Sequence, residues 1–455
     1  MENLKNLHES ALKHLFVGMS NTDDLNSEGG PTILKEGKGI YVWDEEGNRY
    51  LDGISGMYFR NIGYGREEVA KEIYEQLSNV SMNMYSAVTE VTILLAQKIA
   101  DLTPGNLTKT FFSSGGSEAN ETSIKMAQAF HNRQGNKGRY KIISRKGSYH
   151  GGTLGTMWLG SHPFLPRNEY QPVPLNVLHA PNPNPYRFEE IGARSEEECG
   201  EKAAKAIEDL IVFHNPDSIS AVIGEPVAQP LGGVVPPSNY WPMVKNICEK
   251  YGVILIFDEI ITGFGRLGEW FGSDLVKVTP DIMSVAKGMT SGYFPLGASI
   301  ASSQVSRLFN GGKEESFKHM FTYSGHPGGS AAALKNIEII ENENLVFNAK
   351  IRGEQLKTGL KELKNKLKII GDVRGTGLLQ GLEFVKDRKT KELFSSKAKL
   401  GKRITDGLRK RGVWIKVSDY ILPIAPPLTI SSSEINDLLL VIEETLVDVQ
   451  KELFS

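Results

Sequence analysis

The sequence predicts an α/β protein with a large domain around a mostly parallel sheet and a second, smaller α+β domain. Continuous apolar runs of strand length recur through the middle of the chain, with helical segments between them, which is typical of a parallel sheet covered on both faces. Glycine is frequent, at 47 of 455 residues, as expected for many tight turns. After about residue 335 this alternation gives way to a charged helical segment and short strand-like runs around glycines.

The N-terminal part begins with a leading helix and a polar loop in 1–30. Two short β-type runs follow in 39–55, and the turn signal Glu46-Gly47-Asn48 between them predicts a hairpin. From 67 to 102 the pattern is helical. Its clearest part is an apolar stripe at helical spacing, formed by Val91, Leu94, Leu95, Ile99 and Leu102.

The central part alternates strands and helices. The apolar runs predict strands at 108–112, 139–143, 220–224, 253–257, 281–286 and 296–301. Helical stretches lie between several of them, including 117–131 and 239–251. We expect the Pro- and Asn-rich segment 161–200 to be an irregular surface loop.

The C-terminal part predicts a charged helix near 345–368, short strands around glycines in 369–385 and a final helix that Ser431 and Glu434 open as a capping box. These elements suggest three regions. Residues 66–330 form the large domain, residues 331–455 form the small domain, and the N-terminal segment 1–65 belongs with the small domain.

Composition and charge exclude several classes of protein. The 52 basic and 54 acidic residues give a net charge of −2, so no basic excess points to a nucleic acid or an acidic membrane surface. The longest strongly apolar runs have five residues, against the roughly 20 that a membrane helix needs. The polar N-terminus and two isolated cysteines favour a cytoplasmic protein. Its nine histidines show no metal-ligand spacing, so we expect no metal site.

The segment SSGGSEAN (113–120) follows a predicted strand and opens a predicted helix. Glycines let a ligand approach the backbone, and free N–H groups at a helix start suit a phosphate. Ser117 could donate to that phosphate or simply cap the helix. Taken alone, the segment favours an ordinary strand–turn–helix connection with Ser117 as the cap.

The segment VILIFDEIITGFGRLG (253–268) places Asp258 and Glu259 at the end of a buried strand, where open α/β sheets bind ligands. It contains a formal G-x-G-x-x-G at Gly263–Gly268. Two acids precede these glycines and would repel a pyrophosphate, so the context argues against a dinucleotide site. The Asp-Glu pair resembles a Walker B strand, but the chain has no matching phosphate loop.

The segment DIMSVAKGMTSGYFPLGA (281–298) places Lys287 directly after a strand-like run and before glycines. A lone lysine after a strand is usually a solvated loop residue. At the strand ends of an active site it can instead be a covalent nucleophile, because desolvation readily lowers its pKa.

Together these segments resemble the class III pyridoxal-phosphate aminotransferases of fold type I, in particular the ω-amino-acid and amine transaminases. The resemblance spans essentially the whole chain. Further matching segments are LDGISGMYFRNIGYGR (51–66), GSYHGGT (147–153), GEPVAQPLGGVVPP (224–237), FTYSGHP (321–327) and APPLTIS (425–431).

The resemblance implies pyridoxal 5′-phosphate (PLP) as cofactor and assigns roles by position. Lys287 and Asp258 are the implied catalytic residues: the lysine binds the cofactor covalently and moves the substrate proton, and the aspartate keeps the pyridine nitrogen protonated. The resemblance also implies a homodimer, or a tetramer, whose sites are shared between subunits through Thr322. The remaining implied cofactor contacts are Gly115, Gly116 and Ser117 at the phosphate, and Tyr149, His150, Glu225 and Ile260 around the ring.

Substrate recognition departs from the pattern of 2-oxoglutarate-dependent relatives. Residues 227–231 contain no acid, and no arginine lies just before the segment 425–431, where Lys416 is the nearest cation. The resemblance places Phe16, Tyr58, Arg60 and Lys416 at the substrate site.

We therefore expect an enzyme that moves the terminal amine of an ω-amino acid or amine to a keto acid, with pyruvate preferred. Two alternatives belong to the same family. They are 7,8-diaminopelargonate synthesis, against which Gly152 and Lys13–Phe16 count, and a glutamate-semialdehyde-type aminomutase. An alternative of another class is a nucleotide-binding oxidoreductase or ATPase built on 263–268.

Overall fold

The computed structural model describes residues 2–18, 20–162, 169–170, 176–418 and 420–454. Its largest sheet has seven strands in the order β4-β10-β9-β8-β7-β5-β6 within this part of the chain. Strands β5 to β9 run parallel, and only β10 runs antiparallel to its neighbours β9 and β4, which confirms the mostly parallel sheet. The strands are β4 (Leu107–Ser113), β5 (Lys141–Arg145), β6 (Val177–Ala180), β7 (Ile219–Gly224), β8 (Ile254–Asp258), β9 (Ile282–Val285) and β10 (Gly297–Ser302).

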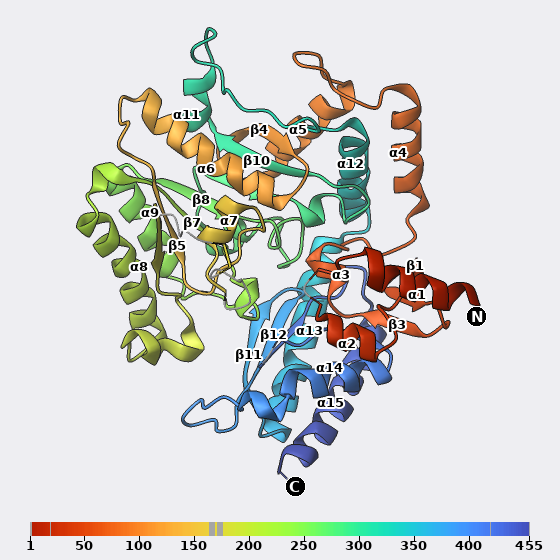
Figure 1. The fold of residues 1–455 in the computed structure, drawn as a ribbon. Coiled ribbons are helices and arrows are strands. Elements are labelled where there is room, and N and C mark those ends of the chain that lie inside the picture. Colours follow the sequence, from red (N-terminus) through yellow and green to blue (C-terminus); the bar gives the residue numbers. More distant parts are fainter. Residues whose placement is uncertain (1, 19, 163–168, 171–175, 419, 455) are drawn as a thin grey trace.

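Helices cover both faces of this sheet (Figure 1). Successive side chains of a strand point to opposite faces, and β8 shows the result. Leu255 and Phe257 pack with α8 (Glu196–Phe213) and α9 (Tyr240–Tyr251) in one apolar cluster. Ile254 and Ile256 pack with α6 (Gly116–Arg133) in another. The continuous apolar run therefore reflects burial on two sides.

Two smaller sheets lie with the C-terminal helices. One has the order β1-β2-β3-β13, in which β13 (Val413–Trp414) pairs in parallel with β3 (Arg49–Asp52). The other is antiparallel and has the order β11-β12-β14. Figure 1 shows the N-terminal elements in red beside the C-terminal helices in blue. The strands are β1 (Leu34–Lys38), β2 (Tyr41–Asp44), β11 (Ile370–Thr376), β12 (Leu379–Phe384) and β14 (Ile421–Ile424). The proposed domain boundaries stay a prediction.

The capping box at the last helix forms as expected: Ser431 N donates to Glu434 Oε2 at 2.8 Å, and Glu434 N donates back to Ser431 Oγ at 3.3 Å. The other helices are α1 (Glu2–His14), α2 (Thr22–Ser27), α3 (Ser55–Tyr58), α4 (Glu67–Asn79), α5 (Glu90–Leu102), α7 (Leu154–Leu159), α10 (Gly272–Val276), α11 (Ser303–Ser306), α12 (Pro327–Asn342), α13 (Leu345–Lys366), α14 (Leu400–Lys410) and α15 (Ser432–Phe454). Among the described residues, no helix combines the length and apolar character needed to cross a bilayer.

Two expectations about secondary structure were wrong. The helical pattern of 67–102 is interrupted, because residues 80–89 form an irregular segment between α4 and α5. The segment 161–200 is not an irregular loop throughout. It contains β6 and the start of α8, which Ser195 caps through Glu198 N, while 163–168 and 171–175 lie outside the described residues.

Candidate active site

The candidate site lies where several parallel strands end. Asp258 is the last residue of β8, and it pairs with Ser284 of β9, three residues before Lys287. The residues that follow β4, β5 and β7 reach the same edge, since parallel strands end on one side of a sheet. This topology brings the three motif segments of the sequence together.

Asp258 is buried, with 4% of its surface exposed, and both of its oxygens accept hydrogen bonds. Oδ2 accepts from Asn120 Nδ2 and from His150 Nδ1, both at 2.8 Å, and Oδ1 accepts from Ile260 N at 3.1 Å. These donors hold the carboxylate in one orientation. The arrangement leaves acceptor capacity on Oδ1 for one further donor.

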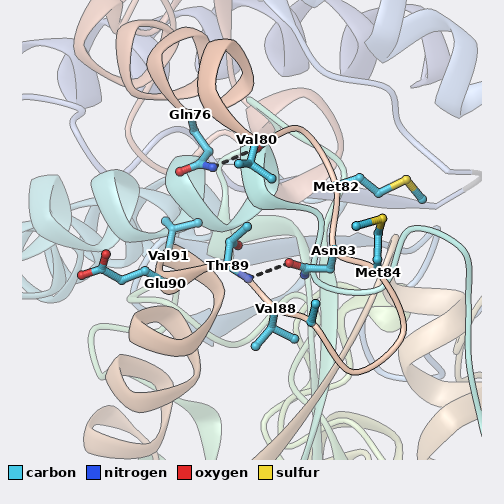
Figure 2. Close-up of a pocket in the computed structure, with 10 residues that line it drawn as sticks. Gln76, Val80, Met82, Asn83, Met84, Val88, Thr89, Glu90 and Val91 are labelled. Atoms are coloured by element: carbon cyan, nitrogen blue, oxygen red, sulfur yellow. Dashed lines mark hydrogen bonds between the residues drawn. The ribbon is translucent and has the colours of Figure 1, made fainter.

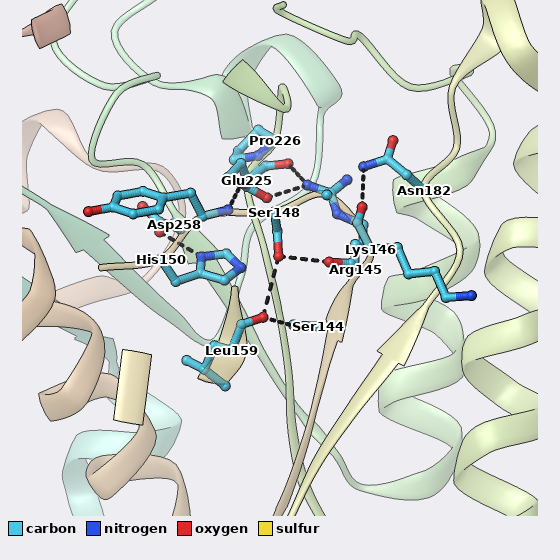
Figure 3. A network of polar contacts seen from close by, with 12 residues as sticks. Ser144, Arg145, Lys146, Ser148, His150, Leu159, Asn182, Glu225, Pro226 and Asp258 are labelled. Carbon is cyan, nitrogen blue, oxygen red and sulfur yellow. Dashed lines mark hydrogen bonds and ion pairs between the residues drawn. The ribbon is translucent and has the colours of Figure 1, made fainter. Parts of the chain in front are cut away.

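The electrostatic environment of His150 is set by two acids, Asp258 and Glu225. Burial acts to lower the pKa of His150, but the negative charges of Glu225 and Asp258 outweigh it and raise that pKa. Glu225 also accepts from Tyr149 N at 3.2 Å and from the buried Arg145 at 2.8 Å (Figure 3). Glu225 is therefore a structural brace for the segment that carries Tyr149 and His150.

Lys287 occupies a strained position, with a left-handed φ of 39°, directly before Gly288. Burial lowers the pKa of Lys287 to about 8, although the charge of Asp258 acts in the opposite direction. A lysine in this state is partly deprotonated near neutral pH, so it can act as a nucleophile or accept a proton. The Tyr58 ring lies 5.5 Å from its Nζ.

The start of α6 forms an open cradle. A Cβ added to Gly115 would meet nothing within 4 Å, whereas one on Gly116 would meet Ile260 Cδ1 at 2.8 Å. Ser117 does not cap the helix, since Gly115 is the cap residue. Its Oγ accepts instead from Gly152 N at 3.0 Å, which joins the cradle to the segment after His150. Free N–H groups and the helix dipole at this point favour an anion.

The predicted substrate residues are spread more widely. The Tyr58 ring lies near Lys287, while Arg60 packs its guanidinium against three aromatic rings, of which Tyr64 and Tyr293 lie 4.6 and 4.9 Å from it. Phe16, Lys416 and Thr322 are exposed in the single chain.

Sequence reasoning missed three residues that support the site. Asn120 was quoted only as the end of a motif, although its i, i+4 spacing from Gly116 places both on one face of α6. Arg145 ends β5, and Arg266 follows the glycines after β8; both are buried. Strand-end position was a usable signal for Arg145, whereas nothing local in the sequence identifies the partners of Arg266.

Fold and site together define a lysine-dependent enzyme of the α/β class with an anion cradle. The chain matches the aminotransferase class-III family over residues 25–446 and belongs to that family. It is a PLP-dependent transaminase. This membership replaces the oxidoreductase or ATPase interpretation of 263–268.

Relatives with a named activity match nearly the whole chain. A putrescine–pyruvate aminotransferase of Pseudomonas aeruginosa is 35% identical over 91% of this chain and 90% of its own length. A gamma-aminobutyrate transaminase 3 of Solanum lycopersicum is 34% identical, over 92% and 81%. The crystal structure of an (S)-enantioselective ω-transaminase from Thermomicrobium roseum matches with a TM-score of 0.93 at 39% identity, covering 98% of both chains.

The residues of the site fit PLP. Asp258 keeps acceptor capacity for a protonated ring nitrogen, and the space at Gly115 leaves the helix start open to a phosphate. His150 Nε2 and Asn120 Oδ1 are buried polar atoms without a hydrogen-bond partner, so the site has unused capacity beside Asp258. When bound, the cofactor supplies an electron sink for the carbon that loses a proton.

Proposed function

We propose that this enzyme transfers the terminal amino group of an ω-amino acid or simple amine to pyruvate. The observation that carries the proposal is that Lys287, desolvated and electrostatically coupled to the buried Asp258 carboxylate, lies at the same sheet edge as an open helix start. The putrescine–pyruvate relative supports both the type of donor and the acceptor. The absence of an acid in 227–231 supports the same acceptor.

Each site residue has a defined role in this proposal. Lys287 holds the cofactor and carries the proton that leaves the substrate carbon, a task for which a pKa of about 8 is well matched. Asp258 holds the proton on the ring nitrogen. Gly115, Gly116 and Ser117 receive the phosphate at the start of α6. Tyr149 and Ile260 flank the ring.

We further propose a homodimer that shares its active sites. Apolar side chains are exposed along 77–94 and 320–323, among them Tyr85 at 98% and Met84 at 68%. An apolar hollow opens between α4 and α5, with Val80, Met82 and Val88 on its wall (Figure 2). Exposed apolar patches of this kind mark association surfaces. Thr322 adjoins this surface in sequence, as a contact to the partner's phosphate requires. A cytoplasmic location stays a prediction.

Two measurements test the proposal. The purified enzyme with PLP should show a visible band near roughly 400 nm that borohydride abolishes, with the label recovered on Lys287. A panel of amine donors and keto acceptors should then show ping-pong kinetics and highest turnover for a terminal amine with pyruvate. Label on another lysine, or turnover restricted to α-amino acids, would contradict the proposal.

A further inference from the structure

Arg266 is a fully buried arginine whose guanidinium joins distant parts of the chain. It donates to Ser55 Oγ at 3.1 Å and to Asn61 Oδ1 at 2.7 Å. It also donates to the main-chain carbonyls of Leu378 and Pro426. Burial lowers the pKa of Arg266 to about 9, against the attraction of the nearby acid Asp52. Burying a charge costs free energy even when hydrogen bonds compensate part of it, so a buried arginine with these contacts suggests a positioning role.

The turn that Arg266 holds has unusual backbone geometry. Ser55 and Tyr58 adopt left-handed φ values of 50° and 66°, which a residue with a side chain keeps only when its surroundings enforce them. Ser55 Oγ accepts from Arg266 and donates to Ala425 O at 2.7 Å. Asp52 accepts from the main-chain N–H of Ile54 at 3.1 Å, immediately before the turn. The turn is therefore fixed at its start and along its side.

This turn presents Tyr58 to Lys287. The phenol ring lies 5.5 Å from the lysine Nζ, and burial raises the pKa of Tyr58, with Arg266 acting in the opposite direction. The second side-chain partner of Arg266, Asn61, lies beside Gly288, the residue that follows the lysine. Asn61 Nδ2 donates to Phe264 O at 2.8 Å and lies so close to Gly288 that a Cβ there would come within 2.5 Å of it. Both side-chain partners of Arg266 thus lead to the surroundings of Lys287.

We propose that Arg266 is a positioning residue: it holds the Ser55–Tyr58 turn so that the Tyr58 ring covers the amine of Lys287 and keeps water from it. The inference deepens the function proposed above and rests on the role of Lys287 in it. Arginine suits the task because its planar fork can reach four acceptors at once, which a lysine ammonium on a flexible stem cannot do.

The test measures the amine of Lys287 in the enzyme without cofactor. Labelling of Lys287 by reductive methylation, quantified by peptide mass spectrometry across pH 6.5–10, gives its pKa. In Arg266→Lys the Tyr58 ring should lose its fixed position, water should reach the amine, and the pKa of Lys287 should rise. Relative to its high-pH plateau, labelling at pH 8 should then fall by about twofold or more, because a smaller fraction of the amine is deprotonated. Tyr58→Ala should give the same change, and the double variant should add little to it.

Two further variants keep the test decisive. Arg139→Lys is the matched control, because Arg139 is also buried and donates to the carbonyls of Tyr251 and Gly252, both at 3.0 Å; its profile should match the wild type. Ser55→Ala removes one acceptor of Arg266 and should give a smaller shift in the same direction if Arg266→Lys does not fold.

A fall in melting temperature for Arg266→Lys or Ser55→Ala with an unchanged Lys287 profile would reduce Arg266 to a structural role and overturn the inference. An unchanged profile in Tyr58→Ala would overturn it as well, because the ring would then not shield the amine. Failure of the proposed function can be distinguished from failure of this inference. It would appear as borohydride label on a different lysine, whatever the methylation profiles show.

Discussion

The carboxylate of Asp258 and the imidazole of His150 lie 2.8 Å apart, Oδ2 to Nδ1, at the carboxyl end of β8. Because Asn120 donates to the same oxygen, Oδ2 is occupied by two protein donors. The other oxygen keeps room beside the Ile260 N–H. In the proposed role of Asp258, Oδ1 is therefore the oxygen that we expect to meet the ring nitrogen of the cofactor.

Asp258→Asn should retain PLP but lose orders of magnitude in turnover, because an amide cannot keep the ring nitrogen protonated. Single-turnover kinetics and the cofactor content of the purified variant measure the two effects separately. If the variant is unstable but its folded fraction turns over at the wild-type rate, Asp258 only ends a strand.

Lys287→Ala should give a folded protein that binds cofactor without a covalent link and cannot complete a transamination half-reaction. Stopped-flow spectra after addition of an amine donor, with circular dichroism as a control for folding, show the outcome. Near-wild-type turnover with cofactor bound would remove Lys287 from the mechanism.

Glu259 introduces a pH dependence of stability. Burial raises the pKa of Glu259 to about 7, although the N–H groups of Gly272 and Ser273 donate to it. Because the pKa of Glu259 is higher in the folded protein than in the unfolded chain, protonation of Glu259 stabilises the fold. This contribution is fully present below about pH 4.5 and is lost as pH rises through 7.

Glu259→Gln removes the titratable carboxyl group. It also places an amide NH₂ group, itself a donor, opposite one of the N–H groups that now donate to Glu259. It should lower the free energy of unfolding by about 1–3 kcal/mol at pH 5, and the difference from wild type should narrow by pH 8. Urea unfolding at both pH values checks this. A difference that widens with pH would contradict the sign.

Sharing of the active site between subunits can be tested by mixing two inactive chains. A Lys287→Ala chain and a Thr322→Ala chain should form a mixed dimer in which one site combines the intact Lys287 with the partner's intact Thr322. We expect cofactor affinity and activity to recover in half of the sites. Mixed dimers that form, as shown by differential tagging, but remain inactive would place Thr322 outside the phosphate site.

Pyruvate should exceed 2-oxoglutarate in kcat/KM by at least about tenfold, or roughly 1.4 kcal/mol. A dicarboxylate needs a second well-placed cation, whereas Lys416 is exposed and Arg60 packs against aromatic rings. Measuring both acceptors with one amine donor decides this. A preference for 2-oxoglutarate would mean that Arg60 turns toward the substrate, and Arg60→Met should then abolish it.

The sequence predicted the helices and strands in which apolar residues form a clear pattern. β8 and α15 show clear apolar patterns, so both were found close to their observed bounds. β6 was missed because it has only four residues at the edge of the sheet and lies in a Pro- and Asn-rich stretch. The residues on both sides of 80–89 have helical spacing. The pattern therefore could not show that they belong to two separate helices with an irregular segment between them.

The residues of the candidate site also fall into two groups: those that a local sequence pattern predicts and those that it does not. Lys287 and Asp258 could be located because each follows a strand within a motif. Asn120 and Arg266 act through partners that no local pattern identifies, since the contacts of Arg266 range from Ser55 to Pro426. Only the folded chain shows which distant residues meet.

The pairing of β3 with β13, in which Leu51 lies opposite Val413, has a consequence for biosynthesis. The N-terminal segment leaves the ribosome first but cannot dock until more than 360 residues have followed it. Until Pro426 has also been synthesised, Arg266 beside the turn that carries Tyr58 lacks one of the two main-chain carbonyls that it binds in the folded chain. We therefore expect the ends of β8 and β9 to form before the turn that carries Tyr58 takes its final position beside Lys287, so that the candidate pocket is completed late in folding.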